Sequence, residues 1–185
     1  METQIAIKTK KLEVLSEEEI LSCAPNPDQC GGSGGCKGGT AELAYEYTAQ
    51  NGIHDIQTVP YTGKNDVAVC PQKETSLRGK SDDAVLTKMK GFAVLPNNDE
   101  KCLMNAIAKH GSVVIAVNAN PFMHYSGGIF DTANPSNIDL DHAVTLEGYG
   151  TGKSNLGFFT HQFLPIHFFN FRLRSAKSKK IRKRS

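Results

Sequence analysis

With 185 residues, the chain is long enough for one domain with a substantial core and is short for two. Its hydrophobic content of 39% and charged content of 22% are ordinary for a soluble globular protein. No apolar run approaches the roughly 18–20 residues of a membrane helix, and the N-terminus lacks the apolar segment of a secretory signal. We therefore expect a globular protein with no membrane contact and no signal peptide in this chain.

Charge is distributed unevenly along the sequence. Residues 158–185 contain eight Lys or Arg and no Asp or Glu. Because the formal net charge of the whole chain is +2, the first 157 residues carry a net charge of −6. The basic cluster KSKKIRKRS is typical of nucleic-acid binding or of a nuclear address. The alternative is a disordered terminus outside the folded domain. We favour this alternative, because the composition changes abruptly after Gly157, and we expect no nucleic-acid partner.

A first helix is predicted to start after Ser16 and to end near Cys23. Ser16 and Glu19 have the spacing of a capping box. In such a box the serine accepts from the third helical N–H and the glutamate reaches back to the cap. The dipeptide Asn26-Pro27 then prevents the helix from continuing.

A glycine-rich segment, CGGSGGCKGGT, follows at residues 30–40 and is predicted to form no regular element. It does not match a phosphate-binding loop, because Lys37 is followed by Gly38 and not by Ser or Thr. Two interpretations remain: a flexible turn, or a backbone ribbon over which an extended peptide lies. Thr40 then caps a second helix that stops at Gly52.

The remaining elements favour an α+β fold, because helices come first and strands dominate later. Residues 53–88 have the composition of coil. Asp99 is predicted to cap a helix over residues 100–110, with Gly111 as its end. The inward side chains of this helix are expected to be Leu103, Ile107 and Ala108. Strands are predicted at 89–96, 112–119 (an apolar run, expected to be buried on both faces), 127–130 and 142–150.

Several phrases, in order and at matching spacing, resemble the papain family of cysteine peptidases, cathepsin L-like members in particular. LSEEEILSC is similar to LSEQxLVDC, GGCKGGT to the GCxGG ribbon, and NGIHDIQTVPYTG to GI…YPYxG. NAIAKHGSVVIAVNA, YSGGIF and LDHAVTLEGYGT match later family segments. The resemblance covers residues 15–157 and implies an incomplete papain-like fold, with part of a helical lobe and part of a barrel-like lobe. It places residues 1–14 and 158–185 outside the family pattern.

The resemblance also implies roles for individual residues. His142 matches the catalytic histidine, the general base that takes a proton from a thiol nucleophile. The ribbon that pairs with the substrate backbone corresponds to Gly38 and Gly39. Asp141 matches the residue directly before that histidine. In the family, the backbone of this residue borders the part of the site that holds the leaving group. The walls of the pocket for the second substrate residue before the cut, where an apolar side chain is expected, match Ala116, Leu140 and Ala143.

Two parts of the family's catalytic machinery find no match. No CGSCW-like segment with the nucleophile precedes LSEEE, and no NSWG-like motif supplies the orienting asparagine, since Asn155 and Asn170 stand in other contexts. The resemblance therefore implies a cysteine peptidase homologue, acting on peptides or proteins, that is inactive as written. Alternatives are a non-catalytic peptide-binding decoy or regulator, or a nucleic-acid binder through the basic tail.

Five cysteines stand at 23, 30, 36, 70 and 102, without CxxC pairs or zinc spacing, so neither a metal nor a cofactor is expected. The resemblance implies a Cys23–Cys70 disulfide and leaves Cys36 as a free thiol. Cys30 and Cys102 are extra to the family pattern and are candidates for a second bond. Cysteine usage suggests an oxidising compartment, and the family implies a lysosomal, vacuolar or secreted protein.

Overall fold

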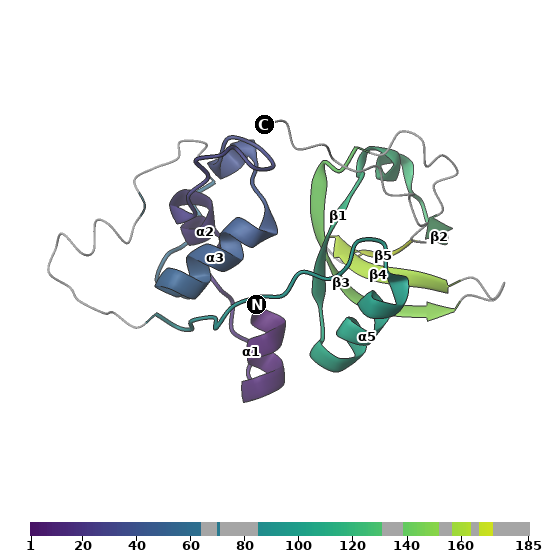
Figure 1. The fold of residues 1–185 in the computed structure, drawn as a ribbon, viewed down its shortest axis with the longest axis horizontal. Coiled ribbons are helices and arrows are strands. Elements are labelled where there is room, and N and C mark those ends of the chain that lie inside the picture. Colours follow the sequence, from purple (N-terminus) through teal and green to yellow (C-terminus); the bar gives the residue numbers. More distant parts are fainter. Residues whose placement is uncertain (64–69, 71–84, 131–138, 152–156, 164–166, 172–185) are drawn as a thin grey trace, which may run out of the picture. The chain divides into compact units, whose positions relative to one another are not determined.

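The computed structural model describes residues 1–63, 70, 85–130, 139–151, 157–163 and 167–171. The chain divides into two compact units, Met1–Ala93 and Val94–Ser185 (Figure 1). In its described part, the first unit is helical, whereas the second is built around a five-stranded sheet and one α-helix. This segregation of helices and strands is the expected α+β class. No helix in the described ranges is both long enough and apolar enough to cross a bilayer.

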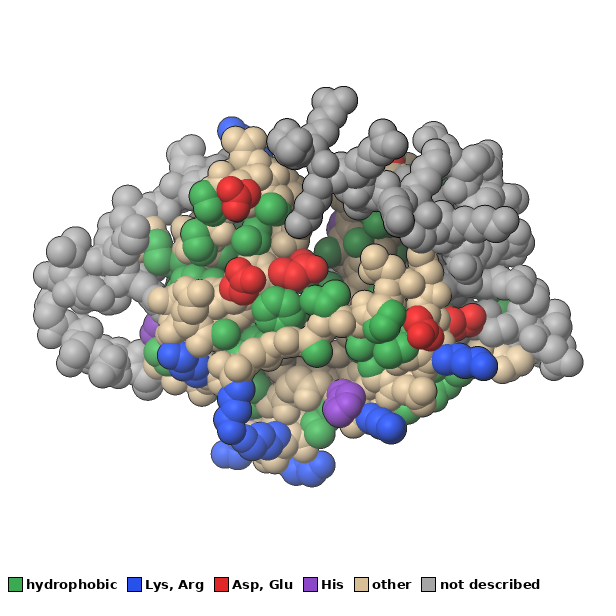
Figure 2. All heavy atoms as spheres, viewed as in Figure 1, with side chains coloured by type: hydrophobic (Ala, Val, Ile, Leu, Met, Phe, Trp, Pro, Cys, Tyr) green, Lys and Arg blue, Asp and Glu red, His purple; other side chains and the backbone are tan. Residues whose placement is uncertain are grey.

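The helices of the first unit are short. They are α1 (Glu2–Thr9), α2 (Glu17–Cys23), the 3₁₀ turn η1 (Gly35–Lys37) and α3 (Ala41–Asn51). The sequence did not predict α1, which is tied to the start of α2 by a hydrogen bond of 2.9 Å from the Leu15 N–H to the Glu2 carboxylate. Lysine side chains gather at the end of α1 on the face drawn in Figure 2, where Lys8, Lys10 and Lys11 are exposed.

At the N-terminus of α2, the predicted role of Ser16 as the cap is correct, and the predicted return of the Glu19 side chain to the cap is wrong. The Ser16 hydroxyl accepts from the Glu19 N–H at 3.0 Å, as in a capping box. Glu19, however, does not return to the cap. The Ser16 N–H donates instead to the carbonyl of His54 at 2.9 Å. Because this distant carbonyl satisfies the cap, the Glu19 carboxylate is available for contacts elsewhere.

Helix α3 ends as the sequence predicts, at a glycine. Gly52 has φ +81 and its N–H donates to the Thr48 carbonyl at 2.9 Å. A Cβ built there would lie 2.1 Å from Val85 Cγ1, so neither the backbone angle nor the space admits another residue. At the other end, Thr40 occupies the cap position without a side-chain hydrogen bond, so the predicted side-chain cap is not formed.

The second unit places helix α5 against the sheet. Its elements are α5 (Glu100–His110), β1 (Val113–Val117), the 3₁₀ turn η2 (Asn120–His124), β2 (Ile129–Phe130), β3 (His142–Thr151), β4 (Gly157–Phe163) and β5 (His167–Phe171). The strand order is β1-β3-β4-β5-β2, and every pair is antiparallel except β2 with β5. The core combines α5 with the inner face of the sheet: Leu103, Ile107, Val117, Val144, Leu146 and Phe159.

Four expectations for this half of the chain are corrected. Residues 89–96 form no strand, because no described strand pairs with them. Residues 157–163 and 167–171 form β4 and β5, whereas the sequence predicted no strand after residue 150; residues 172–185 lie outside the described ranges. Ala108 is exposed, since it lies one residue past the buried Ile107 on the helix. Strand β1 is an edge strand and only Val117 in it is buried.

Candidate active site

The glycine-rich loop of the first unit is a pair of backbone segments in direct contact. Gly31 and Gly32 run against Gly38 and the residues beside it. A Cβ at Gly38, which has φ +100, would lie 2.5 Å from the Gly31 carbonyl oxygen. A Cβ at Gly32, which has φ +136, would lie 2.2 Å from the Lys37 carbonyl oxygen. Because both approaches are closer than any side chain allows, the glycines are required by geometry and the segment is a defined ribbon.

One asparagine holds this loop in place, and the sequence reading missed it. The Asn26 side-chain amide donates to the Cys30 carbonyl at 3.1 Å and to the Gly32 carbonyl at 2.8 Å. Its oxygen accepts from the Cys30 N–H at 2.8 Å. From the sequence alone, Asn26 is assigned no role other than ending the helix before Pro27. Its position ahead of a glycine run was the available signal, because Asn side chains commonly bond to backbone a few residues on.

Gly38 and Gly39 differ in what their backbones can bind. The Gly38 N–H donates to Gly35 at 3.3 Å and its carbonyl accepts from Gly34 at 2.9 Å, so both groups maintain the loop. Gly39 is exposed, and its N–H and carbonyl form no backbone hydrogen bond with any other described residue. A Cβ at Gly39 would meet only Leu43 Cδ1, at 3.9 Å. The Gly39 N–H is therefore open to a ligand, whereas the Gly39 carbonyl oxygen lies against Gly31, 2.7 Å from a Cβ built there. Gly38 supports the loop.

The cysteines of the structure agree with two expectations and contradict one. Cys23 and Cys70 form a disulfide within the first unit, and Cys36 is a free, exposed thiol. Cys30 and Cys102 are also free, so the second bond considered from the sequence is not present. That suggestion rested on the cysteine count alone. Cys30 lies in the glycine-rich loop and Cys102 on α5, in different units of the chain.

In the second unit, the predicted site residues cluster where β3 begins beside β1. His142 is the first residue of β3, is exposed, and lies opposite Val117. The next pair in the register is Ala143 with Ala116, and both are exposed. Directly opposed side chains share a face and successive residues alternate. The two alanines therefore form a small apolar surface on the face opposite to that of the His142 side chain.

Asp141 fixes the turn that leads into His142. Its carboxylate accepts from the Ala119 N–H at 2.8 Å and from the Asn120 side-chain amide at 2.9 Å, while its own N–H donates to the Val117 carbonyl at 3.2 Å. Leu140, one residue earlier, is 61% exposed. Sequence reasoning did not identify Asn120 as a partner, because the contact joins residues 21 positions apart. In the described part of the chain, no three His, Cys, Asp or Glu side chains gather as metal ligands would.

The chain is similar to known cysteine proteases along most of its length. The papain family cysteine protease profile matches residues 1–162, which extends beyond residues 15–157 at both ends. The chain is 39% identical to caricain of Carica papaya over 145 residues, which are 78% of this chain and 37% of caricain. It is 35% identical to procathepsin L of Rattus norvegicus over 153 residues, which are 81% of this chain and 41% of that protein.

Solved structures give the same result for the fold. Digestive procathepsin L 3 of Tenebrio molitor larval midgut superposes with a TM-score of 0.73 at 25% identity, covering 92% of this chain and 53% of that one. Bromelain of Ananas comosus, solved in complex with the E64 inhibitor, superposes with a TM-score of 0.73 at 26% identity. The match covers 92% of this chain and 74% of the bromelain chain. The chain spans less than half the length of the two curated relatives named above. With the profile matching most of its length, the chain belongs to the papain family of cysteine proteases.

Proposed function

We propose that this chain is part of the machinery of a papain-type cysteine peptidase, which hydrolyses peptide bonds. The observation that carries the proposal is the open N–H of Gly39 on a loop whose close backbone contacts exclude side chains. An extended peptide offers a carbonyl along its edge, which can accept a hydrogen bond from the Gly39 N–H as an added strand does. Recognition of this kind holds a substrate by its main chain, which every peptide has.

In the proposal, His142 acts as the general base. An imidazole changes its protonation state near neutral pH, so it can take a proton from a thiol and return it to the leaving amine. The Asp141 carboxylate accepts hydrogen bonds from Ala119 and Asn120. These bonds hold Asp141 in position directly before His142. Ala116, Ala143 and Leu140 are proposed to form an apolar surface for the second substrate residue before the cut. This surface lies beside the start of β3, with the two alanines on the face opposite to the His142 side chain.

The nucleophile is proposed to lie outside these 185 residues. Cys23 and Cys70 are bonded to each other, Cys30 and Cys36 belong to the glycine-rich loop, and Cys102 lies on α5. No sequence segment matches the family's nucleophile or its orienting asparagine. We therefore infer that the 185-residue chain alone binds peptides without cleaving them. The disulfide favours an oxidising compartment, and we propose a lysosomal, vacuolar or secreted location.

The test has a catalytic arm and a binding arm. In the first, the chain is incubated with fluorogenic peptides that carry Leu or Phe as the second residue before the reporter group, and we expect no turnover. Turnover by the parent chain that disappears in His142→Ala would contradict the inferred inactivity and would support the base.

The binding arm uses fluorescence anisotropy of the same uncleaved peptides. Gly39→Pro removes the N–H donor and is expected to weaken binding by about five- to tenfold, for the loss of one hydrogen bond. Gly39→Ala is the matched control, because its Cβ meets only Leu43 at 3.9 Å and its N–H is retained. Equal affinities of both variants and the parent would refute the role of Gly39.

A further inference from the structure

The segment that joins the two units, residues 88–97, belongs to no helix or strand, and most of its residues are exposed. Figure 1 draws it as an open trace that leads into α5. Lys88, Lys90 and Gly91 are exposed, and Val94 is 71% exposed. The boundary between the compact units falls inside the segment, after Ala93. Chain connections of this kind are where proteases cut folded proteins, because the backbone can enter an active site without unfolding of a core.

Backbone pairing ends just before this segment. Thr87 is the last paired residue, with its carbonyl accepting from the Ile53 N–H at 2.9 Å and its N–H donating to the Ile53 carbonyl at 3.3 Å. From residue 88 to residue 97, no backbone hydrogen bond joins the segment to another described residue. A protease binds its substrate as an extended strand, so it requires a backbone whose hydrogen-bonding groups are not already used.

Contacts at both ends of residues 88–97 limit the part of this segment that a protease could bind. Phe92 packs its ring against Tyr45, with centroids 5.5 Å apart, and Leu95 packs against the core of the second unit. Lys88 follows Thr87 directly, so a cut after Lys88 would require the Ile53 pairing to open. Lys90 has two residues without backbone pairing before it, and Gly91 after it has φ +146 with no atom within 4 Å of a Cβ built there.

We propose that the Lys90–Gly91 bond is a site of limited proteolysis by an endopeptidase specific for basic residues. Water supplies the hydroxyl of the new Lys90 carboxylate and the hydrogen of the new Gly91 amine, so no further reactant is needed. The products are residues 1–90 and 91–185, each of which contains one compact unit apart from three residues at the boundary. Cys23 and Cys70 both lie in the first product, so no disulfide joins the two.

Cleavage at this bond would separate the two groups of candidate site residues. Gly39 lies on the first product and His142 on the second. The proposed cleavage does not depend on the function proposed above, because the bond's accessibility depends only on the exposure and pairing of residues 88–97.

The experiment is limited digestion of the full chain with trypsin, followed by mass spectrometry of each cleaved bond over time. Lys101 and Lys109 provide internal controls, since both are exposed but lie in helix α5. We expect the Lys90–Gly91 bond to be cut at least about tenfold faster than the bonds after either control, since local opening of a helix by about 1.4 kcal/mol already costs that factor.

The variant K90Q should abolish this cut and leave the rates after Lys101 and Lys109 unchanged. Equal rates at all three lysines, or a bond at 90–91 that survives after α5 has been cut, would overturn the proposal. The readout is cleavage of a named bond and not turnover of a peptide substrate. Failure of this proposal is therefore distinguishable from failure of the peptidase function.

Discussion

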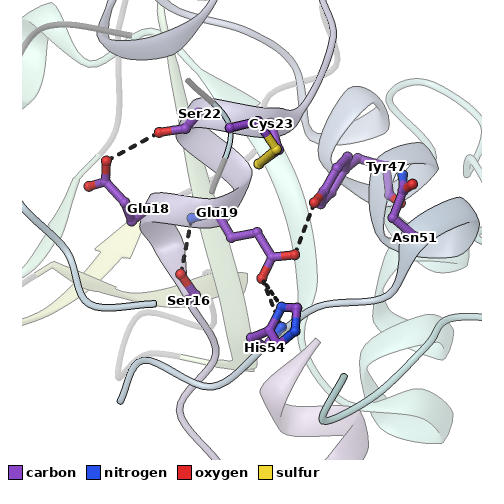
Figure 3. Close-up of a disulfide and its surroundings, with 9 residues drawn as sticks. Ser16, Glu18, Glu19, Ser22, Cys23, Tyr47, Asn51 and His54 are labelled. Atoms are coloured by element: carbon purple, nitrogen blue, oxygen red, sulfur yellow. Dashed lines mark hydrogen bonds and ion pairs between the residues drawn. A yellow bond between two sulfur atoms is a disulfide. The ribbon is translucent and has the colours of Figure 1, made fainter. Parts of the chain in front are cut away.

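Replacing Glu19 by alanine should remove the central polar contact of the first unit. The Glu19 side chain is fully buried between α3 and the segment after it (Figure 3). Its carboxylate accepts from the Tyr47 hydroxyl at 2.9 Å, and from the His54 N–H and Nδ1 at 2.8 and 3.0 Å. Burial, together with the neighbouring Glu19 charge, raises the pKa of Tyr47 well above its ordinary value, so the phenol keeps the proton that it donates.

The expected loss follows from the groups left behind. In Glu19→Ala, the buried Tyr47 hydroxyl and the partly buried His54 N–H both lose the carboxylate that accepts from them, and a buried donor that loses its acceptor costs about 1–3 kcal/mol. The volume of the carboxylate is also left empty. We expect the free energy of unfolding to fall by about 3–5 kcal/mol, a large share of the roughly 5–15 kcal/mol that holds a domain folded.

Urea unfolding followed by far-UV circular dichroism measures this loss. Glu17→Ala is the matched control, because Glu17 lies in the same helical turn but is exposed, and it should cost less than about 1 kcal/mol. Glu19→Gln keeps the volume and one acceptor oxygen, so its cost should lie between those of the two alanine variants. If Glu19→Ala and Glu17→Ala lose the same free energy at equal m-values, the contacts of Glu19 are not what stabilises this unit.

Further predictions concern the same unit. Replacing both cysteines of the Cys23–Cys70 bond by serine opens a loop of sequence separation 47 and should lower the free energy of unfolding by about 4 kcal/mol in the chain-entropy estimate; parent and variant with equal urea midpoints would argue against it. Asn26→Ala removes three hydrogen bonds and should raise amide hydrogen exchange in the glycine-rich loop, while exchange in α5 stays unchanged. Gly38→Ala should disturb the same loop, because φ +100 and the 2.5 Å contact both exclude a Cβ; an unchanged exchange pattern would contradict this. The Thr62 N–H, with smaller help from hydroxyl groups, holds the pKa of Glu18 below its usual value of about 4.3, so its stabilisation is present above that pH and is lost as the pH falls below it; Glu18→Gln should make the acid-induced loss of stability shallower.

Local rules predicted the ends of helices well, because caps depend on residues that are neighbours in sequence. Ser16 and Asp99 cap α2 and α5 as expected, and Gly52 and Gly111 end α3 and α5. Rules based on neighbouring residues could not predict that Glu19 contacts His54, since His54 is 35 positions away in the sequence.

Patterns that need a distant partner were less reliable. The apolar stretch within residues 89–96 is suited to a strand. A strand forms only where another backbone pairs with it, however, and an apolar composition does not identify that partner. Cysteine counting suggested a bond between Cys30 and Cys102 for the same reason, because it carries no information about distance. The candidate site residues were found through resemblance; the supports Asn26 and Asn120 became visible only from the contacts they make.

The order of strands in the sheet has a consequence for biosynthesis. Strands β3, β4 and β5 follow one another as antiparallel neighbours, whereas the edge strands β1 and β2 precede the strands with which they pair. On the ribosome, the apolar run Val113–Val117 therefore emerges 25 residues ahead of His142, where its partner begins. At about 5–20 residues per second, this leaves the nascent edge uncovered for roughly one to five seconds. During that interval, a chaperone that binds exposed apolar strands would bind this chain most readily.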